Sequence, residues 1–122
     1  MQSYKGLEVY KKSYGLAIKL YELTRCFPKE ERIGLVSQIR RAATSIPLNI
    51  AEGYGKVEIG KELLRYLSMA RGSSAELEVL LNFSKDLGYI SQDEYSKLIA
   101  IQEEVGKMLT GLIKSIKAKI TS

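Results

Sequence analysis

The chain has 122 residues, of which 45% are hydrophobic and 27% are charged, and its formal net charge is +5. This length fits one core, so we predict a single domain over residues 1–122. No apolar stretch approaches the ~20 residues that cross a bilayer, and the N-terminus lacks the features of a signal peptide, which predicts a cytoplasmic protein. Histidine is absent and Cys26 is the only cysteine, which excludes an intrachain disulfide and a Cys/His zinc site. We therefore expect no metal and no other cofactor.

The charges are distributed unevenly along the sequence. Residues 1–61 carry a net charge of +5, residues 62–106 a net charge of −4, and residues 107–122 a net charge of +4. An acidic segment between two basic ones favours a polarised surface that binds a polyanion or a second copy. A basic surface that serves only solubility is the simpler interpretation.

Apolar residues recur every three or four positions through most of the chain, which predicts helices rather than strands. The first helix is expected over about 5–25, the second over 31–54 and the third over 58–87. The fourth begins after Ser91, which forms a capping box with Glu94, and continues towards the C-terminus. Long helices with short links predict an all-α fold, an antiparallel up-down-up-down four-helix bundle.

The first predicted helix has two apolar stripes, roughly 100° or more apart. We assign its tyrosine-rich stripe to the core, with Tyr10, Tyr14 and Tyr21 buried. A monomer would then expose the second stripe, and an exposed apolar patch usually marks an interface. The alternative is one wide core-facing side with a few exposed leucines. We favour the interface because three members keep a seven-residue repeat, and the predicted oligomer interface is Val9, Leu16, Leu20 and Leu23.

Basic side chains also follow a seven-residue spacing on the first helix. Lys5, Lys12 and Lys19 line one edge, which is most often only a solvated face. Repeated around an oligomer, such a row forms a belt of charge that binds RNA phosphates. Because the tyrosines are assigned to the core, few aromatic rings are left to stack on bases. Binding is therefore expected to be driven by the RNA backbone and to be weakly sequence-selective. The predicted nucleic-acid-binding residues are Lys5, Lys12, Lys19, Arg40, Lys114 and Lys117.

Polar residues share one side of the second predicted helix, opposite its isoleucines. Folding the third helix back brings Arg40 or Arg41 within reach of Glu76, and arginine suits a carboxylate. Three interpretations are a structural polar network, an RNA-contacting row and a carboxylate active site. The last is disfavoured because the Glu-x-x-His motif of di-iron bundles is absent. We favour the structural network, whose predicted members are Arg41, Ser45, Asn49, Glu52 and Glu76.

Two segments carry a resemblance to a known family. The run QIRRAATSIPLNIAEGYGK, followed by LLRYLSMARGSSAELEVLL, resembles the bacterial family first known from intervening sequences in 23S rRNA genes. The resemblance covers nearly the whole chain, and RRA, SIPLNIAEG and ARGSSAELE are its most specific elements. It implies an antiparallel four-helix bundle that assembles as a homopentamer, and it does not imply an enzyme. The accessory protein of diversity-generating retroelements, a basic pentamer that binds the reverse transcriptase and its RNA, has a similar fold.

Two functional hypotheses follow from these residues and from the resemblance. The first is a non-catalytic, oligomeric RNA-associated protein that binds nucleic-acid backbone through basic surfaces. The alternative is a protein–protein scaffold or accessory subunit, for example of a reverse transcriptase, with no direct role in RNA binding. The expected partners are further copies of the chain, RNA or another protein, and no membrane is expected.

Overall fold

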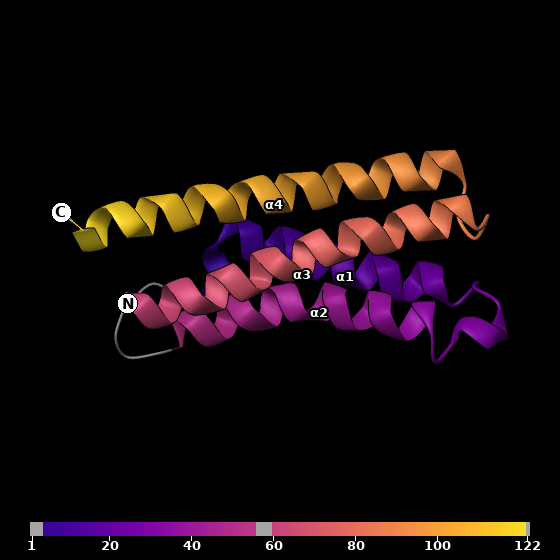
Figure 1. Ribbon diagram of the computed structural model, residues 1–122, viewed down its shortest axis with the longest axis horizontal. Helices are drawn as coiled ribbons and strands as arrows, with labels where there is room; N and C mark the ends of the chain where they lie inside the picture. Colours follow the sequence, from indigo (N-terminus) through magenta and orange to yellow (C-terminus); the bar gives the residue numbers. More distant parts are fainter. Residues whose placement is uncertain (1–3, 56–59, 122) are drawn as a thin grey trace.

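The computed structural model describes residues 4–55 and 60–121, and these residues form helices joined by turns. The elements are η1 (Tyr4–Gly6), α1 (Glu8–Thr24), η2 (Lys29–Glu31), α2 (Leu35–Tyr54), α3 (Lys61–Asp86) and α4 (Gln92–Thr121). Successive long helices run in opposite directions along a common axis (Figure 1). The predicted all-α four-helix bundle is confirmed.

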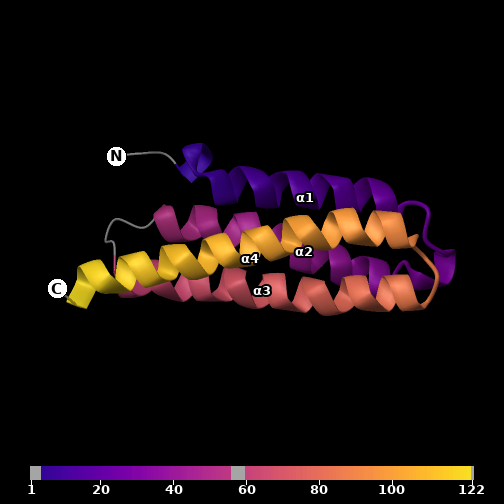
Figure 2. The same cartoon turned by 90° about the horizontal axis from the view of Figure 1, so that it is seen from above.

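Each long helix has two neighbours in the bundle. Helix α1 packs against α2 and α4, and α3 packs against the same two helices, whereas no Cα atoms of the diagonal pairs lie within 8 Å of each other among the described residues. Helix α4 has 30 residues and α1 has 17, so α4 extends past the N-terminal end of α1 (Figure 2). Apolar side chains of all four helices meet along the centre of this arrangement.

The turn between α3 and α4 is set by hydrogen bonds that the sequence encodes. Gly88 has a φ of 81°, and the next residue, Tyr89, donates its N–H to Ser84 O at 2.9 Å. This is the left-handed glycine ending that closes many helices. At the start of α4, Glu94 N donates to Ser91 Oγ at 3.0 Å and Ser91 N donates to the Glu94 carboxylate at 2.8 Å. The predicted capping box is therefore confirmed.

Helix α2 begins four residues later than predicted. The chain first forms the 3-10 turn η2, and the Glu31 carboxylate then accepts the N–H of Leu35 at 3.3 Å. The other Glu31 oxygen accepts the Tyr89 hydroxyl at 2.8 Å, which raises the pKa of Tyr89 above its ordinary value. One carboxylate thus caps α2 and ties it to the α3–α4 turn, which explains the later start.

The orientation of α1 is opposite to the prediction. Val9, Leu16 and Leu20 are buried in the core of a single chain, and Leu23 is partly buried against it. The predicted outward-facing oligomer interface at Val9, Leu16, Leu20 and Leu23 is therefore wrong. Tyr14 and Tyr21 face outward instead, with Tyr14 53% exposed, and Tyr10 is partly buried against the core.

Polar residues within the leucine stripe explain why the expected orientation was wrong. Ser13 and Thr24 lie on the buried face, where a hydroxyl needs a hydrogen-bond partner. Each donates back to its own helix, Ser13 to Tyr10 O at 3.1 Å and Thr24 to Leu20 O at 2.7 Å. Leucines fill the core without any polar atom to satisfy, whereas an outward tyrosine keeps its hydroxyl in water.

Helices α2 and α3 approach each other most closely near Gly53. A Cβ atom at this position would lie 2.9 Å from Leu63 Cδ1 and 3.0 Å from Tyr66 Cβ. Leu63 is itself buried, so it has little room to move away. Glycine is therefore required here by the packing of α3 rather than by its backbone angles.

Replacing Gly53 with alanine is expected to destabilise the protein by about 1–3 kcal/mol through overpacking. This loss outweighs the gain of up to ~1 kcal/mol that alanine brings to a helix interior. Gly72→Ala is the matched control, because nothing lies within 4 Å of a Cβ there, and it should stabilise the fold. Urea unfolding of both variants checks this, and equal changes would contradict the close approach.

The orientation of α1 gives a second test. Leu16→Ala should cost roughly 2–5 kcal/mol, because it leaves a cavity in the core. Tyr14→Ala, on the exposed face, should change the free energy of unfolding by only about 0.5 kcal/mol. Thermal unfolding of the two variants measures the difference, and a larger loss for Tyr14→Ala would restore the opposite orientation.

Candidate nucleic-acid interface

Two adjoining clefts near the η2 end of α1 and α2, which we call the basic clefts, are lined by cationic side chains. The first has a volume of about 310 Å³ and is lined by Arg25, Lys29, Arg32 and Arg40. The second, of about 380 Å³, shares two of these residues and adds Arg41. No carboxylate is among the described residues that line either cleft. This concentration of positive charge, of which only Arg41 is paired with a carboxylate (Glu76), suits a phosphate group.

Arg40 is held in place where the two clefts meet. Its Nε donates to Thr24 Oγ1 at 3.0 Å, and Nη2 donates to Tyr21 O at 3.2 Å. The guanidinium also stacks on the Tyr21 ring, with 4.5 Å between Cζ and the ring centroid. Because a guanidinium has five N–H groups, further donors remain for an anion. Arg40 thus links α1 to α2 and presents a positioned cation to both clefts.

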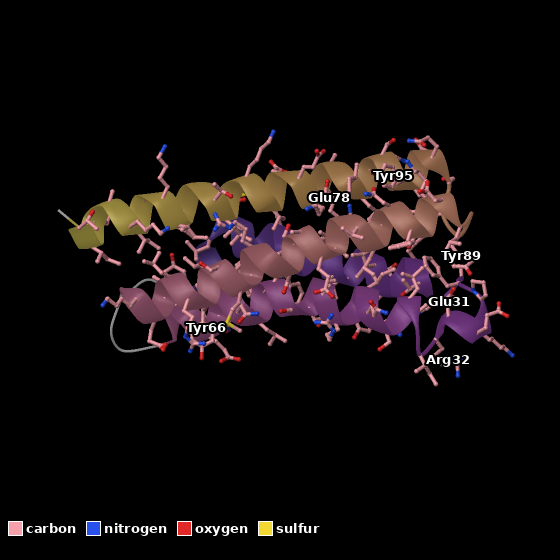
Figure 3. All side chains as sticks on the ribbon, viewed as in Figure 1. Glu31, Arg32, Tyr66, Glu78, Tyr89 and Tyr95 are labelled. Atoms are coloured by element: carbon pink, nitrogen blue, oxygen red, sulfur yellow. The ribbon has the colours of Figure 1, made fainter. Side chains whose placement is uncertain are left out.

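The other cations of the first cleft have no such anchors. Arg25, Lys29 and Arg32 are exposed, and their side chains make no hydrogen bond or ion pair with the residues described. Figure 3 shows Arg32 at the same end of the bundle as Glu31 and Tyr89. These three cations are free to meet an incoming anion.

Sequence reasoning missed Arg25, Lys29 and Arg32 because they keep no helical spacing. They follow the end of α1 and surround η2, where periodicity carries no information. The density of basic residues in this segment could have indicated the site, because five Lys or Arg residues lie from position 25 to position 41. The two glutamates in that segment had obscured it, but Glu31 is bonded to Leu35 and Tyr89 and lines neither cleft.

The structure distributes the predicted nucleic-acid-binding residues over different sides of the bundle. Lys12 Nζ pairs with Glu104 at 3.2 Å, and Lys19 lines a groove between α1 and α4. Both therefore lie on the α4 side of α1, away from Arg40 on the α2 side. Lys5 belongs to η1. The remaining two are exposed on the last turns of α4, namely Lys114 and Lys117.

The predicted polar network forms two separate contacts between α2 and α3. In the first, Arg41 Nη2 pairs with Glu76, with the Arg41 side chain 62% exposed. An exposed pair of this kind contributes about 0–1 kcal/mol, much less than a buried one. Arg41 therefore keeps α2 and α3 in register only weakly.

The second contact joins Ser45 to Asn49 and to α3. Asn49 Nδ2 donates to Ser45 O at 2.8 Å and to Ser45 Oγ at 2.9 Å. Ser73 Oγ of α3 donates to the same Ser45 hydroxyl at 2.8 Å. Glu52 is exposed and makes no hydrogen bond or ion pair with any described residue. The structure thus brings four of the five predicted members into contacts and leaves Glu52 outside them.

An apolar groove of about 370 Å³, which we call the tyrosine groove, continues from the basic clefts along α1 and α2. Its most exposed apolar side chain is Leu48, at 58%, and the Pro47 ring lies in its floor. The Tyr4 and Tyr10 rings meet edge to face at 4.9 Å. Burial, followed by the neighbouring tyrosines, raises the pKa of Tyr10. The lining residues are Tyr4, Tyr10, Tyr14, Ala17, Ile18, Tyr21, Thr44, Pro47, Leu48 and Ala51.

Residues 4–55 and 60–121 offer neither a metal site nor a membrane-spanning helix. No group of three or more His, Cys, Asp or Glu side chains in these ranges is placed to hold a metal ion. No helix in the same ranges is both long enough and apolar enough to span a membrane.

The fold and its charged clefts define a small helical-bundle protein with a basic surface at one end. The chain belongs to the family of 23S rRNA-intervening sequence proteins, whose model matches residues 5–111. The resemblance seen in the sequence is thereby confirmed.

A crystal structure from Bacteroides thetaiotaomicron, described as a protein of unknown function from the S23 ribosomal protein family, is similar to this chain. The two are 26% identical with a TM-score of 0.80, over 87% of this chain and 98% of the other. No curated protein matches the chain.

Proposed function

We propose that this protein is a non-catalytic RNA-associated protein that holds the phosphate backbone of RNA in the basic clefts. The observation that carries the proposal is the set of cations lining these clefts with no carboxylate among them. Backbone phosphates supply most of the affinity in sequence-independent nucleic-acid binding. The names of the family and of the similar structure make ribosomal RNA the first RNA to test.

The chemistry of the clefts supports binding rather than catalysis. Guanidinium groups present several N–H donors in a planar fork that matches a phosphate, so Arg25, Arg32 and Arg40 suit anion binding. Arg40 is already positioned by Thr24 and Tyr21, which reduces the entropy lost when a phosphate binds. Exposed tyrosine rings beside the clefts add surfaces on which unpaired bases stack.

Reversing two cleft charges, in an Arg25→Glu and Arg32→Glu double variant, should remove most of the affinity for single-stranded RNA. Four cleft cations on four phosphates give a slope of log affinity against log salt of about −2.8, and losing two of them reduces the slope by about 1.4. Fluorescence anisotropy with a labelled 23S rRNA fragment, over a salt series, measures both quantities. Circular dichroism confirms that the variant is folded.

The matched control is Lys114→Glu with Lys117→Glu, which changes the net charge equally on α4. Its affinity should fall much less than that of the cleft variant. An equal fall would show that only the overall charge matters. A larger fall would place the RNA on α4, where the sequence had also predicted it.

A second candidate function is that of a protein scaffold built from copies of this chain. The tyrosine groove favours it, because Ile18 and Leu48 are exposed apolar side chains facing one cavity. Contiguous apolar surface of this kind usually marks an interface. In this scaffold, copies of the chain would contact one another through the tyrosine groove and not through the buried leucine stripe. The resemblance to the family implies that the assembly is a homopentamer. If the protein is instead an accessory subunit, a protein partner such as a reverse transcriptase would occupy the same groove.

Ile18→Glu combined with Leu48→Glu is expected to reduce the assembled mass to that of a monomer, because the charges would have to be buried in the contact. Both side chains are exposed, so helicity should be retained. The control is Met69→Glu with Leu87→Glu, two exposed apolar positions outside the groove, one in α3 and one directly after its last residue. Sedimentation equilibrium distinguishes the outcomes, and an unchanged mass for the groove variant would exclude this interface.

A further inference from the structure

The first basic cleft lies in the bend between α1 and α2. One wall is the stretch of chain that leaves α1, between Thr24 and Lys29, and the other is formed by Arg32, Val36 and Arg40. The turn η2 joins these two walls at the end of the bundle (Figure 2). The connection between the helices therefore closes the cleft at this end.

The second basic cleft continues from the first along α1 and α2. The two clefts share Arg32, Val36 and Arg40, and the second extends to Tyr21 and Thr44. A chain-like ligand whose end lies in the first cleft leaves through the second. A ligand that continued in both directions would have to cross the connection between the helices. This shape suits the end of a strand better than its middle.

The charges of the two clefts differ as well. The four cations that line the first cleft form no ion pair with any described residue, namely Arg25, Lys29, Arg32 and Arg40. Arg41, the cation that the second cleft adds, is already paired with Glu76. The first cleft therefore has the larger excess of positive charge, and it suits a ligand group with more than one negative charge.

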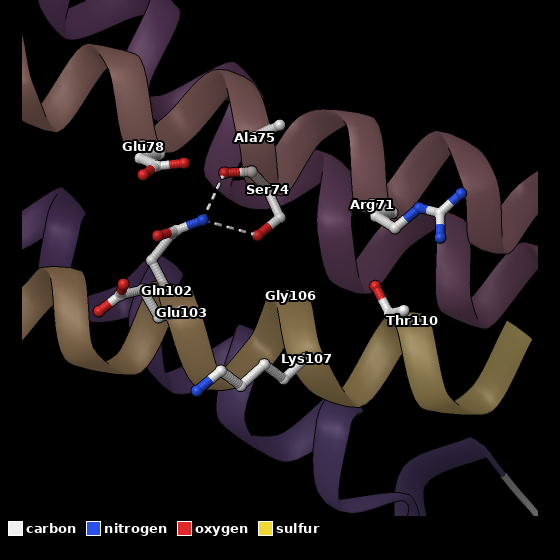
Figure 4. A pocket seen from close by; sticks show the side chains of 9 residues that line it. All are labelled: Arg71, Ser74, Ala75, Glu78, Gln102, Glu103, Gly106, Lys107 and Thr110. Carbon is white, nitrogen blue, oxygen red and sulfur yellow. Dashed lines mark hydrogen bonds between the residues drawn. The ribbon is translucent and has the colours of Figure 1, made fainter. Parts of the chain in front are cut away.

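A cavity on another side of the bundle shows that this charge pattern is not general. It has a volume of about 410 Å³ and lies between α3 and α4 (Figure 4). Arg71 and Lys107 line it, but so do Glu78 and Glu103, so a phosphate there would meet carboxylates. The first basic cleft differs, because no carboxylate is among the described residues that line it.

An RNA strand offers two kinds of phosphate to such a cleft. Each internal diester carries one negative charge, whereas a terminal monoester carries about 1.5 to 2 at pH 7 and has three oxygens that accept hydrogen bonds. We propose that the first basic cleft binds a phosphate monoester, the terminal phosphate of an RNA strand. The inference rests on the proposed function, RNA binding by the basic clefts, and adds that these clefts select the end of the strand.

The lining residues divide the work between the end and the rest of the strand. Arg25 and Lys29 line the first cleft alone, so they contact only the terminal phosphate. Arg41 lines the second cleft alone and contacts the next phosphate. Arg40 lies where the clefts meet and faces both. Recognition of the end can therefore be separated from binding of the strand by substitution.

The ligand test compares four forms of one short single-stranded RNA by fluorescence anisotropy, with the fluorophore on an internal base. The forms carry a 5′-phosphate, a 3′-phosphate, hydroxyls at both ends, or hydroxyls on a strand two nucleotides longer. The longer strand matches the total charge of the phosphorylated strands. A terminal phosphate should tighten binding about tenfold relative to both hydroxyl-ended strands, which corresponds to one charge-assisted hydrogen bond. The tighter of the two phosphorylated strands identifies which end is bound.

The protein test uses one variant for each cleft. Arg25→Gln with Lys29→Gln should reduce the tenfold preference to nearly one, whereas the affinity for the hydroxyl-ended strand should fall less. The control, Arg41→Gln, should weaken binding of phosphorylated and hydroxyl-ended strands equally and keep the preference. All three side chains are exposed, so the variants should fold, and circular dichroism checks this.

The outcomes separate this inference from the proposed function. Equal affinity for the phosphorylated strand and the longer hydroxyl-ended strand, with both lost on charge reversal of the clefts, would overturn end selection and leave RNA binding standing. Failure of every strand to bind would overturn both. A nucleoside monophosphate that binds as tightly as the phosphorylated strand would assign the cleft to a free nucleotide and overturn the RNA end as its ligand.

Discussion

Burial of the leucine stripe of α1 is the constraint on which the other surface features depend. Once Leu16 and Leu20 fill the centre of the bundle, the positions of all other α1 side chains are determined by the helical repeat. Lys12 then meets Glu104 on α4, and Tyr21 meets Arg40 on α2. A rotation of α1 that buried the tyrosines would break both contacts and would close the tyrosine groove.

The basic clefts exist because the chain does not pass directly from α1 into α2. The turn η2 carries Lys29 around the end of α1, and its Glu31 carboxylate is committed to capping α2. The same hydrogen bonds that shape the turn therefore hold the Glu31 carboxylate outside the lining of the clefts that contain Arg32 and Arg40. Local structure and electrostatics are coupled here, since a free Glu31 would compete with a phosphate for these arginines.

The sequence determined the fold more clearly than the surface. The capping box at Ser91 and the glycine at position 88 are local signals, and both ends of the α3–α4 turn followed from them. The choice between the two stripes of α1 is not local, because it depends on which residues the other three helices offer. Arg40 was among the predicted nucleic-acid-binding residues, whereas Arg25 and Arg32 join it only through the path of a turn that periodicity does not describe.

The charge around the tyrosine groove favours one kind of contact between copies of the chain. The tyrosine groove is not complementary to itself in charge, because it runs from an apolar centre into arginines at one end only. Such a surface suits a head-to-tail contact, which closes into a ring when the rotation between copies allows it.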